Sequence, residues 1–192
     1  MTTVQERTIG LTLEAFLVQP DTKPASEYAH GEAVPKPMPD SLHSILQFYF
    51  RLVIGQFLQS HPLGRIHLEW RCVFGPLDAR RAIVPDVTYV SYQRMPKGDP
   101  RVNRYPPGAP DLVIEVLSKD QPFLRFVDKL IFCLANGVRL IWVVDPRAEL
   151  VLVLVPGEDS RVLQVGDVLD GGDVLPGFSV PVAEVMAQLQ ED

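Results

Sequence analysis

The sequence lacks any long apolar run, and this absence sets the first limit on what the protein can be. No uninterrupted hydrophobic stretch approaches the roughly 20 residues that a bilayer-spanning helix needs. The first ten residues, MTTVQERTIG, also lack the apolar segment of a secretory signal peptide. We therefore expect no membrane span and a location in a reducing cytoplasm.

Cysteine is scarce as well. Cys72 and Cys133 are the two cysteines of the chain, and they lie in apolar surroundings without CxxC spacing. Such spacing gives no indication of a zinc motif or of a disulfide framework. Free cysteine is among the most frequently buried residue types, so both are predicted to be core thiols.

An excess of positive charge is also absent. The chain carries 18 Lys and Arg against 24 Asp and Glu, which gives a formal net charge of −6. This balance argues against a broadly basic surface for nucleic acid, although it leaves room for a local basic groove. The sequence contains no internal repeat and no low-complexity tract.

The sequence does contain enough apolar material for one core. Of its 192 residues, 46% are hydrophobic, so we expect a single domain over residues 1–192. Helical and extended patterns alternate around what reads as one sheet. The predicted class is therefore α/β, in the broad sense of an α+β mixed sheet.

Apolar periodicity predicts four helices and eight strands. The helices cover residues 12–18, a long segment capped by Asp40 or Ser41 and ended by His61-Pro62, residues 121–136 and residues 182–189. The strands lie near residues 31–34, 65–73, 83–91, 112–117, 139–144, 149–155, 161–165 and 178–180, and the last two are expected to pair.

Helical spacing also predicts which side chains the two main helices bury. In the long helix these are Leu42, Ile45, Tyr49, Leu52, Val53 and Phe57. In the helix over residues 121–136 they are Phe123, Phe126, Val127, Leu130, Ile131 and Leu134.

One charged residue interrupts an otherwise apolar strand. Residues 112–117 read LVIEVL, and Glu115 lies in the middle of this β-branched run. An isolated carboxylate in a dry core costs several kcal/mol or more, so Glu115 needs a partner. That partner is either a metal ion or a buried Lys or Arg.

A second carboxylate lies in the segment before this strand. Asp86 follows Pro85 in VPDVTYV. If the two strands are neighbours, Asp86 and Glu115 can converge on one face, because side chains two residues apart share a face of a strand. A divalent cation such as Mg²⁺ relieves the repulsion between two such carboxylates. The alternative is that Asp86 is only a turn residue.

The same strand and the helix that follows it carry two further charged candidates. Asp111 shares the strand face of Glu115 and is either an accessory acid of the site or the anchor of the strand start. Lys129 lies at the border of the apolar stripe of its helix. It either returns its ammonium group to the carboxylates or is a solvated flank. Two acids and a lysine around a metal ion can hydrolyse a phosphodiester.

Six segments occur in an order that is typical of one family. They are SEYAHGE, SLHSIL, VPDVTYV, APDLVIEVLS, DKLIFCLANGV and LIWVVDP. Across nearly the whole chain they resemble the Uma-two family of bacterial domains, which is placed in the PD-(D/E)XK nuclease superfamily. The resemblance implies a restriction-endonuclease-like fold with a central mixed β-sheet flanked by helices. It also implies endonuclease activity that depends on Mg²⁺ or Mn²⁺ and acts on nucleic acid, with DNA as the expected substrate.

The resemblance also implies roles for individual residues. Asp86 would be the metal-binding aspartate and Glu115 the acidic residue of the (D/E)XK element, so that both hold the ion. Glu27 would be an extra glutamate from the N-terminal region. Leu117 stands where that element has its lysine, and relatives carry the lysine on the following helix, which points to Lys129.

Three positions depart from the pattern of the family. His30 stands where the family usually has Asp, and Cys133 where it usually has Tyr. Lys119 replaces the usual Pro and is the alternative candidate for the lysine of the site.

If Lys129 acts on the phosphate, Lys129→Ala is expected to lower cleavage sharply and to leave folding nearly intact.

Contacts to DNA are less clearly marked in the sequence. The loop RMPKGDPRVNR and the segment DARR are either phosphate contacts or solubilising surface segments. His43 is either a general base or a helix-packing histidine. Two symmetric cuts in duplex DNA would need a homodimer. The alternative function is a catalytically degenerate nuclease-fold module that serves in binding or scaffolding.

Overall fold

The computed structural model describes residues 8–98, 105–119 and 121–190. A six-stranded mixed sheet forms its centre, in the order β11-β10-β9-β8-β7-β4. Strands β8 and β9 run parallel, and the other neighbours in this sheet are antiparallel. The strands are β4 (Gly64–Leu68), β7 (Val87–Ser91), β8 (Leu112–Val116), β9 (Leu140–Asp145), β10 (Leu150–Leu154) and β11 (Arg161–Leu163).

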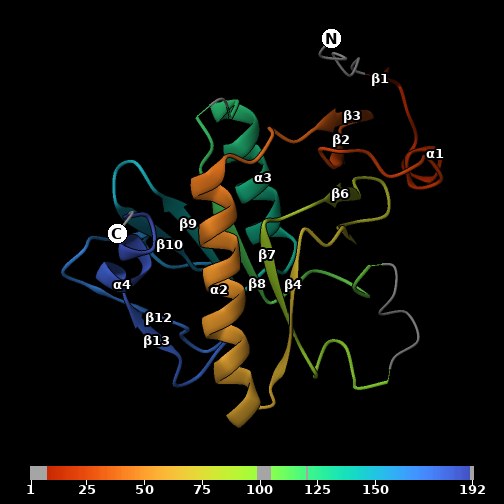
Figure 1. Cartoon of the computed structure of the whole chain (residues 1–192). Coiled ribbons are helices and arrows are strands. Elements are labelled where there is room, and N and C mark those ends of the chain that lie inside the picture. The colour runs from red at the N-terminus through yellow and green to blue at the C-terminus, as the bar shows by residue number, and fades with distance from the viewer. Residues whose placement is uncertain (1–7, 99–104, 120, 191–192) are drawn as a thin grey trace.

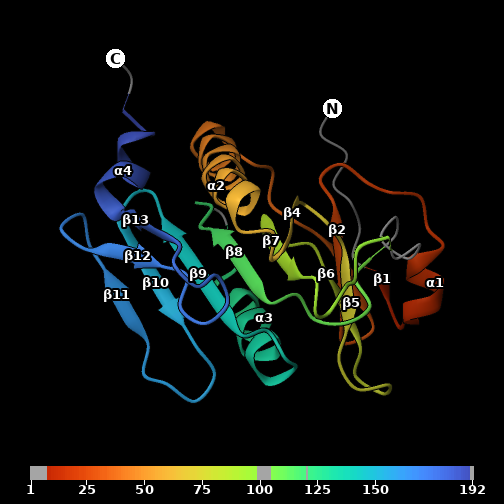
Figure 2. The same ribbon diagram turned by 90° about the horizontal axis from the view of Figure 1, so that it is seen from below.

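A second sheet lies beside the central one (Figure 2) and has the order β1-β3-β2-β6-β5. Its strands are β1 (Thr8–Ile9), β2 (Ser26–Ala29), β3 (Glu32–Pro35), β5 (Cys72–Phe74) and β6 (Arg81–Ile83). His30 and Gly31 connect β2 to β3 with φ of 52° and 75°. A two-residue turn with positive φ at both positions matches the twist of a hairpin, and it fixes the register of β2.

The two longer helices cover opposite faces of the central sheet (Figures 1 and 2). They are α2 (Ser41–Ser60) and α3 (Phe123–Ala135), and two short helices, α1 (Leu13–Leu17) and α4 (Val182–Ala187), complete the set within the described residues. Asp40 caps α2, because its side chain accepts a hydrogen bond of 2.9 Å from the backbone N–H of His43.

The side chains of β8 alternate between the two helical layers. Leu112, Ile114 and Val116 belong to the core on the side of α2, whereas Val113 belongs to the core on the side of α3. Glu115 is two residues from Val113, so the pleat directs it toward α3. This alternation gives Glu115 access to side chains that α3 supplies.

Two segments that read as continuous strands are divided between the sheets. Residues 65–73 form part of β4 and of β5, and residues 83–91 form part of β6 and of β7. The prediction of single strands was therefore wrong. Between β6 and β7, Pro85 has no N–H group to donate to a ladder. Between β4 and β5, Glu69 has a φ of 45°. This left-handed conformation cannot be predicted from the residue type, because glutamate rarely adopts it.

The predicted buried faces of the helices were partly wrong. Helix α2 buries Leu46, Phe50 and Ile54, whereas Ile45 and Leu52 are 37% and 43% exposed. Apolar residues surround most of α2, so periodicity alone does not select the face that meets the sheet.

The predicted buried face of α3 and the predicted pairing of the C-terminal strands were also wrong. Phe123 and Ile131 are 72% and 61% exposed, contrary to prediction. Strand β11 pairs with β10, and β13 (Ser179–Pro181) pairs with β12 (Val168–Asp170), so the predicted pairing of the last two strands was also wrong. Strand β12 was not predicted.

Both cysteines are free and buried, as predicted. They belong to the core between the sheet and α3, where burial raises the pKa of the Cys133 thiol to about 12. Within the described ranges, no helix combines the length and the hydropathy that crossing a membrane requires. A single domain over residues 1–192 stays a prediction.

Candidate active site

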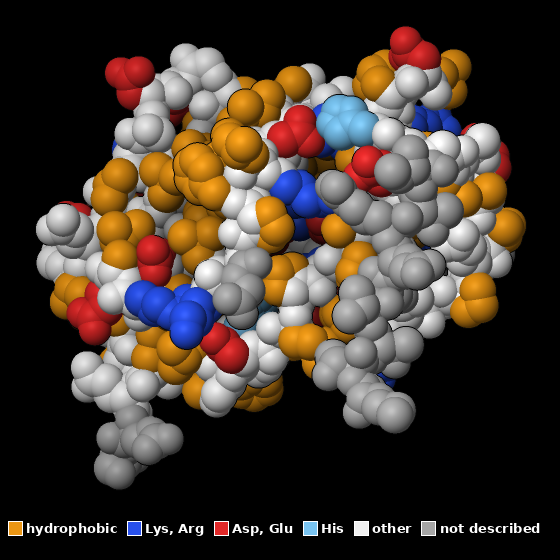
Figure 3. Space-filling view, turned by 90° about the horizontal axis from the view of Figure 1, so that it is seen from above, with side chains coloured by type: hydrophobic (Ala, Val, Ile, Leu, Met, Phe, Trp, Pro, Cys, Tyr) orange, Lys and Arg blue, Asp and Glu red, His pale blue; other side chains and the backbone are white. Residues whose placement is uncertain are grey.

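A cavity of about 200 Å³ opens beside the end of β8 and the first turns of α3. Its lining includes Glu27, Lys36, Asp86, Glu115 and Lys129. Seen from above in Figure 3, the surface is hollowed near its middle, where acidic and basic side chains lie beside hydrophobic ones. The four site residues predicted from the sequence therefore line one cavity, together with a second lysine.

Asp86 lies immediately before β7. The ladder between β7 and β8 pairs Val87 with Ile114, so the same register extended by one residue sets Asp86 opposite Glu115. Pro85 ends the backbone ladder between β7 and β8. Beyond that point, the carboxylate of Asp86 accepts the hydrogen bond from β8. Its Oδ2 accepts a hydrogen bond of 2.7 Å from the backbone N–H of Val116.

The other oxygen of Asp86 lies between two basic groups. Oδ1 is 2.6 Å from Lys36 Nζ and 2.9 Å from His43 Nε2. Burial disfavours the charged carboxylate, but Lys36 and His43 outweigh burial and hold the pKa of Asp86 below its ordinary value. Asp86 is therefore a buried, ionised carboxylate whose two oxygens are both held by contacts inside the protein.

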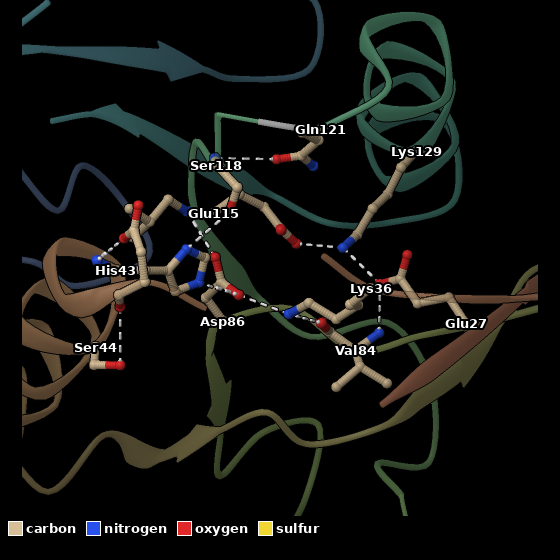
Figure 4. A network of polar contacts seen from close by, with 12 residues as sticks. Glu27, Lys36, His43, Ser44, Val84, Asp86, Glu115, Ser118, Gln121 and Lys129 are labelled. Carbon is tan, nitrogen blue, oxygen red and sulfur yellow. Dashed lines mark hydrogen bonds and ion pairs between the residues drawn. The ribbon is translucent and has the colours of Figure 1, made fainter. Parts of the chain in front are cut away.

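Glu115 projects from β8 toward α3 and is 2% exposed. Its Oε1 lies 2.6 Å from Lys129 Nζ (Figure 4). Burial raises the pKa of Glu115 to about 7, with a further contribution from Asp86, although Lys129 opposes the shift. A buried lysine thus accompanies Glu115, so one of the two partners expected from the sequence is present.

Lys129 is held by two carboxylates, from β8 and from the second sheet. Its Nζ donates to Glu27 Oε1 at 2.6 Å, and the same oxygen accepts a hydrogen bond of 2.8 Å from the N–H of Val84. Burial disfavours the ammonium form, but Glu115 and Glu27 outweigh burial and raise the pKa of Lys129. Lys129 is 7% exposed, so it is not a solvated flank of its helix.

A second ion-pair cluster fixes the turn of α3 that carries Lys129. Arg81 donates to both carboxylate oxygens of Asp128 at 2.6 and 3.2 Å, and its guanidinium lies 4.3 Å from the ring centroid of Phe132. His30 also contacts Asp128 at 3.2 Å. Arg81, in the segment DARR, is therefore 9% exposed and engaged within the protein rather than available for a phosphate.

Lys36 is the site residue that the sequence did not reveal. It lies in the loop after β3, and its Nζ is 2.6 Å from Asp86 Oδ1 and 2.8 Å from the carbonyl oxygen of Val84. In the sequence it is a lysine between two prolines, a context that also fits a solvated loop residue. Contacts with residues about 50 positions away carry no local signal.

His43 contacts the site as well as packing within α2. Its Nε2 lies 2.9 Å from Asp86 Oδ1, and its Nδ1 lies 3.2 Å from Ser118 Oγ. The histidine is 6% exposed and orients the aspartate. A role as general base stays a hypothesis.

Asp111 lies outside the site, at the other end of β8. Its Oδ2 accepts a hydrogen bond of 2.8 Å from Ser91 N–H, and its Oδ1 pairs with Arg94 at 2.9 Å and with Arg139 at 3.4 Å. Of the two alternatives for Asp111, the structure selects the strand anchor. The same contacts engage Arg94, which was a candidate phosphate contact.

The other basic candidates are exposed or lie elsewhere. Lys119 is exposed and does not line the cavity, in contrast to Lys129. Lys97 lies 4.9 Å from the ring centroid of Tyr92. Arg101 and Arg104, also in the loop RMPKGDPRVNR, lie outside the described residues.

The mixed sheet, the helices on both of its faces and the cavity at β7 and β8 define a restriction-endonuclease-like protein. The chain belongs to the Uma2 family, described as "Putative restriction endonuclease", which it matches over residues 13–183. Among solved structures it is similar to one from Anabaena variabilis described as a putative nuclease. The TM-score is 0.82 and the identity 29%, with 94% of this chain and 99% of that chain covered. No curated protein matches the chain. The family and the fold predicted from the six segments are confirmed.

The raised pKa of Glu115 predicts how stability depends on pH. The folded value of about 7 lies above the ordinary value of 4.5, so between these pH values the folded state holds a proton that the unfolded state releases. The free energy of unfolding therefore falls as pH rises through this window, by at most roughly 3 kcal/mol. Denaturant titrations in EDTA from pH 4.5 to 8 measure this decline.

Glu115→Gln is the matched variant for that measurement. It removes the titrating group and keeps nearly the same side-chain volume, so the decline should be absent. Lys129 retains Glu27 as a partner in this variant, so the fold should remain stable. If the wild-type protein and Glu115→Gln show the same pH dependence, Glu115 does not carry the shift.

Proposed function

We propose that the chain is an endonuclease that depends on a divalent metal ion and hydrolyses phosphodiester bonds of DNA. One observation carries the proposal: Asp86 just before β7, Glu115 from β8 and Lys129 from α3 line one cavity in a protein of a restriction-endonuclease family. All three side chains are buried, so they lie close together inside the protein.

The oxygen atoms of the site fit Mg²⁺ or Mn²⁺. The carboxylates of Asp86 and Glu115 and the carbonyl of Val84 are hard oxygen donors, and Mg²⁺ is commonly held by one or two carboxylates together with water. Glu115 Oε1 is buried and, apart from its ion pair, has no aligned hydrogen-bond donor. In the part of the chain that is described, no three His, Cys, Asp or Glu residues form a ligand cluster. Asp86 and Glu115 would therefore hold the ion with water and substrate oxygens.

The residues of the site divide the chemistry among themselves. A bound divalent ion lowers the pKa of water and stabilises charge on a phosphoryl group. Lys129 provides an ammonium group for a phosphate oxygen, and Glu27 keeps that group at the cavity. The N–H of Val116 and the ring of His43 fix both oxygens of Asp86. This arrangement is fixed before the substrate binds, which is what electrostatic catalysis requires.

DNA as the substrate rests on the description of the family as a restriction endonuclease. Binding of a duplex needs positive charge near the cavity. Arg125, Lys36 and Lys129 line the cavity. Paired cuts in both strands would need a two-fold dimer, which we propose on symmetry grounds and which the mass in solution would test.

One observation favours the alternative of a degenerate binding module. Lys36 and Lys129 already neutralise most of the charge of Glu27, Asp86 and Glu115. The cavity therefore needs no metal ion to be stable. Cleavage has to be measured to separate the two functions.

A nuclease assay provides that measurement. With Mn²⁺ the wild-type protein is expected to cut duplex DNA, and EDTA is expected to stop the reaction. Glu115→Gln should lower the rate by at least about 100-fold, because the ion loses one of its two carboxylates. Single-stranded DNA and RNA serve as comparison substrates.

Two results would count against the endonuclease. Cleavage that persists in Glu115→Gln or in EDTA would come from another source. An absence of cleavage on every substrate, with DNA binding retained, would favour the binding module.

A further inference from the structure

The ammonium group of Lys36 lies where the oxygen atoms of the site converge. Its Nζ is 2.6 Å from Asp86 Oδ1 and 2.8 Å from the carbonyl oxygen of Val84, and the field of Glu115 also acts on it. These are the hard donors that a divalent ion would use. Figure 4 shows Lys36 reaching in between Asp86 and Val84.

The charges of the cavity make Lys36 and a divalent ion competitors. Glu27, Asp86 and Glu115 supply three negative charges, and Lys36 and Lys129 supply two positive ones. When all three carboxylates are ionised, they exceed the two ammonium groups by one charge. A divalent ion bound beside both ammonium groups would leave the buried cluster with excess positive charge, and it would share Asp86 Oδ1 with Lys36.

Lys36 is the lysine that can leave the cavity. It forms an ion pair with one carboxylate, whereas Lys129 is paired with both Glu27 and Glu115. Pro35 and Pro37 restrict the backbone on either side of Lys36. Its four-carbon stem is flexible, so the ammonium can move while the loop stays in place.

We propose that Lys36 is a resident cation that occupies the divalent-ion position, so that metal binding displaces it from Asp86 and Val84. The proposal rests on the metal-dependent function above and adds a residue that sets the metal affinity of the site. Without the competing ammonium, the same carboxylates hold the ion more tightly.

Calorimetric titration with Mn²⁺ tests the proposal. Lys36→Met removes the charge and keeps most of the apolar stem, and it should lower the Kd for Mn²⁺ by about tenfold or more, because a like charge next to the ion is gone. Lys119→Met is the matched control. It makes the same substitution at an exposed lysine that does not line the cavity, and it should leave the Kd unchanged.

A second measurement needs no variant at position 36. Reductive methylation followed by mass spectrometry reports which lysines are accessible. Lys36 is expected to be protected in EDTA and to be modified faster at Mn²⁺ concentrations that saturate the wild-type protein. Lys129 should stay protected in both conditions, because Glu27 and Glu115 hold it.

The outcomes separate this proposal from the endonuclease itself. Tighter Mn²⁺ binding by Lys36→Met supports the displacement, even where the wild-type protein binds too weakly to measure. An unchanged or weaker affinity of Lys36→Met overturns it, as does a Lys36 that stays protected at saturating Mn²⁺. If Lys36→Met does not fold, Lys36→Gln and the labelling of the wild-type protein decide. If either of these overturning results is found and the wild-type protein still cleaves DNA, the proposed endonuclease function stands and the proposed role of Lys36 is wrong.

Discussion

Asp86→Asn is expected to abolish DNA cleavage and to lower the free energy of unfolding by about 3–5 kcal/mol. Asp86 Oδ1 lies beside Lys36 and His43, and Oδ2 accepts a hydrogen bond from Val116 N–H. An asparagine amide is neutral, and its nitrogen accepts no hydrogen bond. The substitution leaves the partly buried Lys36 without its counter-charge and removes a proposed metal ligand.

Denaturant titrations and the Mn²⁺-dependent nuclease assay measure both effects of Asp86→Asn. Because the folded pKa of Asp86 is lowered, its stabilisation is present above the unfolded value of 3.8 and is lost as pH falls toward the folded pKa. The difference from the wild-type protein should therefore shrink in acid. Asp78→Asn, at an exposed site, should change stability by less than about 0.5 kcal/mol. A loss below about 1 kcal/mol for Asp86→Asn would show that the buried contacts of this carboxylate contribute little.

Lys129→Met should also have a large effect, on stability as well as on cleavage. The sequence alone predicted that removing this lysine would leave folding nearly intact. In the structure, however, Lys129 is the buried counter-ion of both Glu27 and Glu115. Its loss leaves two carboxylates facing each other without a cation, so we expect a cost of about 3 kcal/mol or more at pH 8.

The pH dependence of Lys129→Met distinguishes this electrostatic cost from a packing defect. At pH 5, below the pKa of about 7 of Glu115 in the wild-type protein, Glu115 can take up a proton, so the variant should regain part of its stability. The double variant Lys129→Met with Glu115→Gln should be more stable at pH 8 than Lys129→Met alone. Equal losses at pH 5 and pH 8, without recovery in the double variant, would indicate a packing defect.

Glu115 shows how two alternatives drawn from the sequence can both describe one residue. From the sequence, Glu115 was interpreted either as a metal ligand or as the partner of a buried Lys or Arg. The buried cation is Lys129, which the family resemblance had already assigned to the site. Because Lys129 also pairs with Glu27, neutralising Glu115 does not leave the lysine unpaired. A stable Glu115→Gln variant is therefore compatible with both a buried ion pair and a metal site.

The sequence by itself determined the features that depend on neighbouring residues. The apolar run of residues 112–117 predicts a buried strand, and its alternation correctly separates the faces of Val113 and Ile114. Asp40 or Ser41 predicts the start of α2 because a cap acts within three residues, and Asp40 is the cap. The six ordered segments predict the family and the fold, since each carries its signal within about ten residues.

Only the tertiary structure decided which distant residues meet in the cavity. Lys36 and Asp86 are 50 positions apart, and Glu27 and Lys129 are 102 positions apart. Their contacts depend on the register of β7 against β8 and on the division of one apparent strand into β6 and β7. Apolar residues occur on several sides of α2, so the sequence did not determine which side is buried. Packing against the sheet determines it. Local patterns determine which elements form, whereas non-local packing and backbone pairing determine which charges become neighbours, and so Lys36 could be assigned to the site only from the fold.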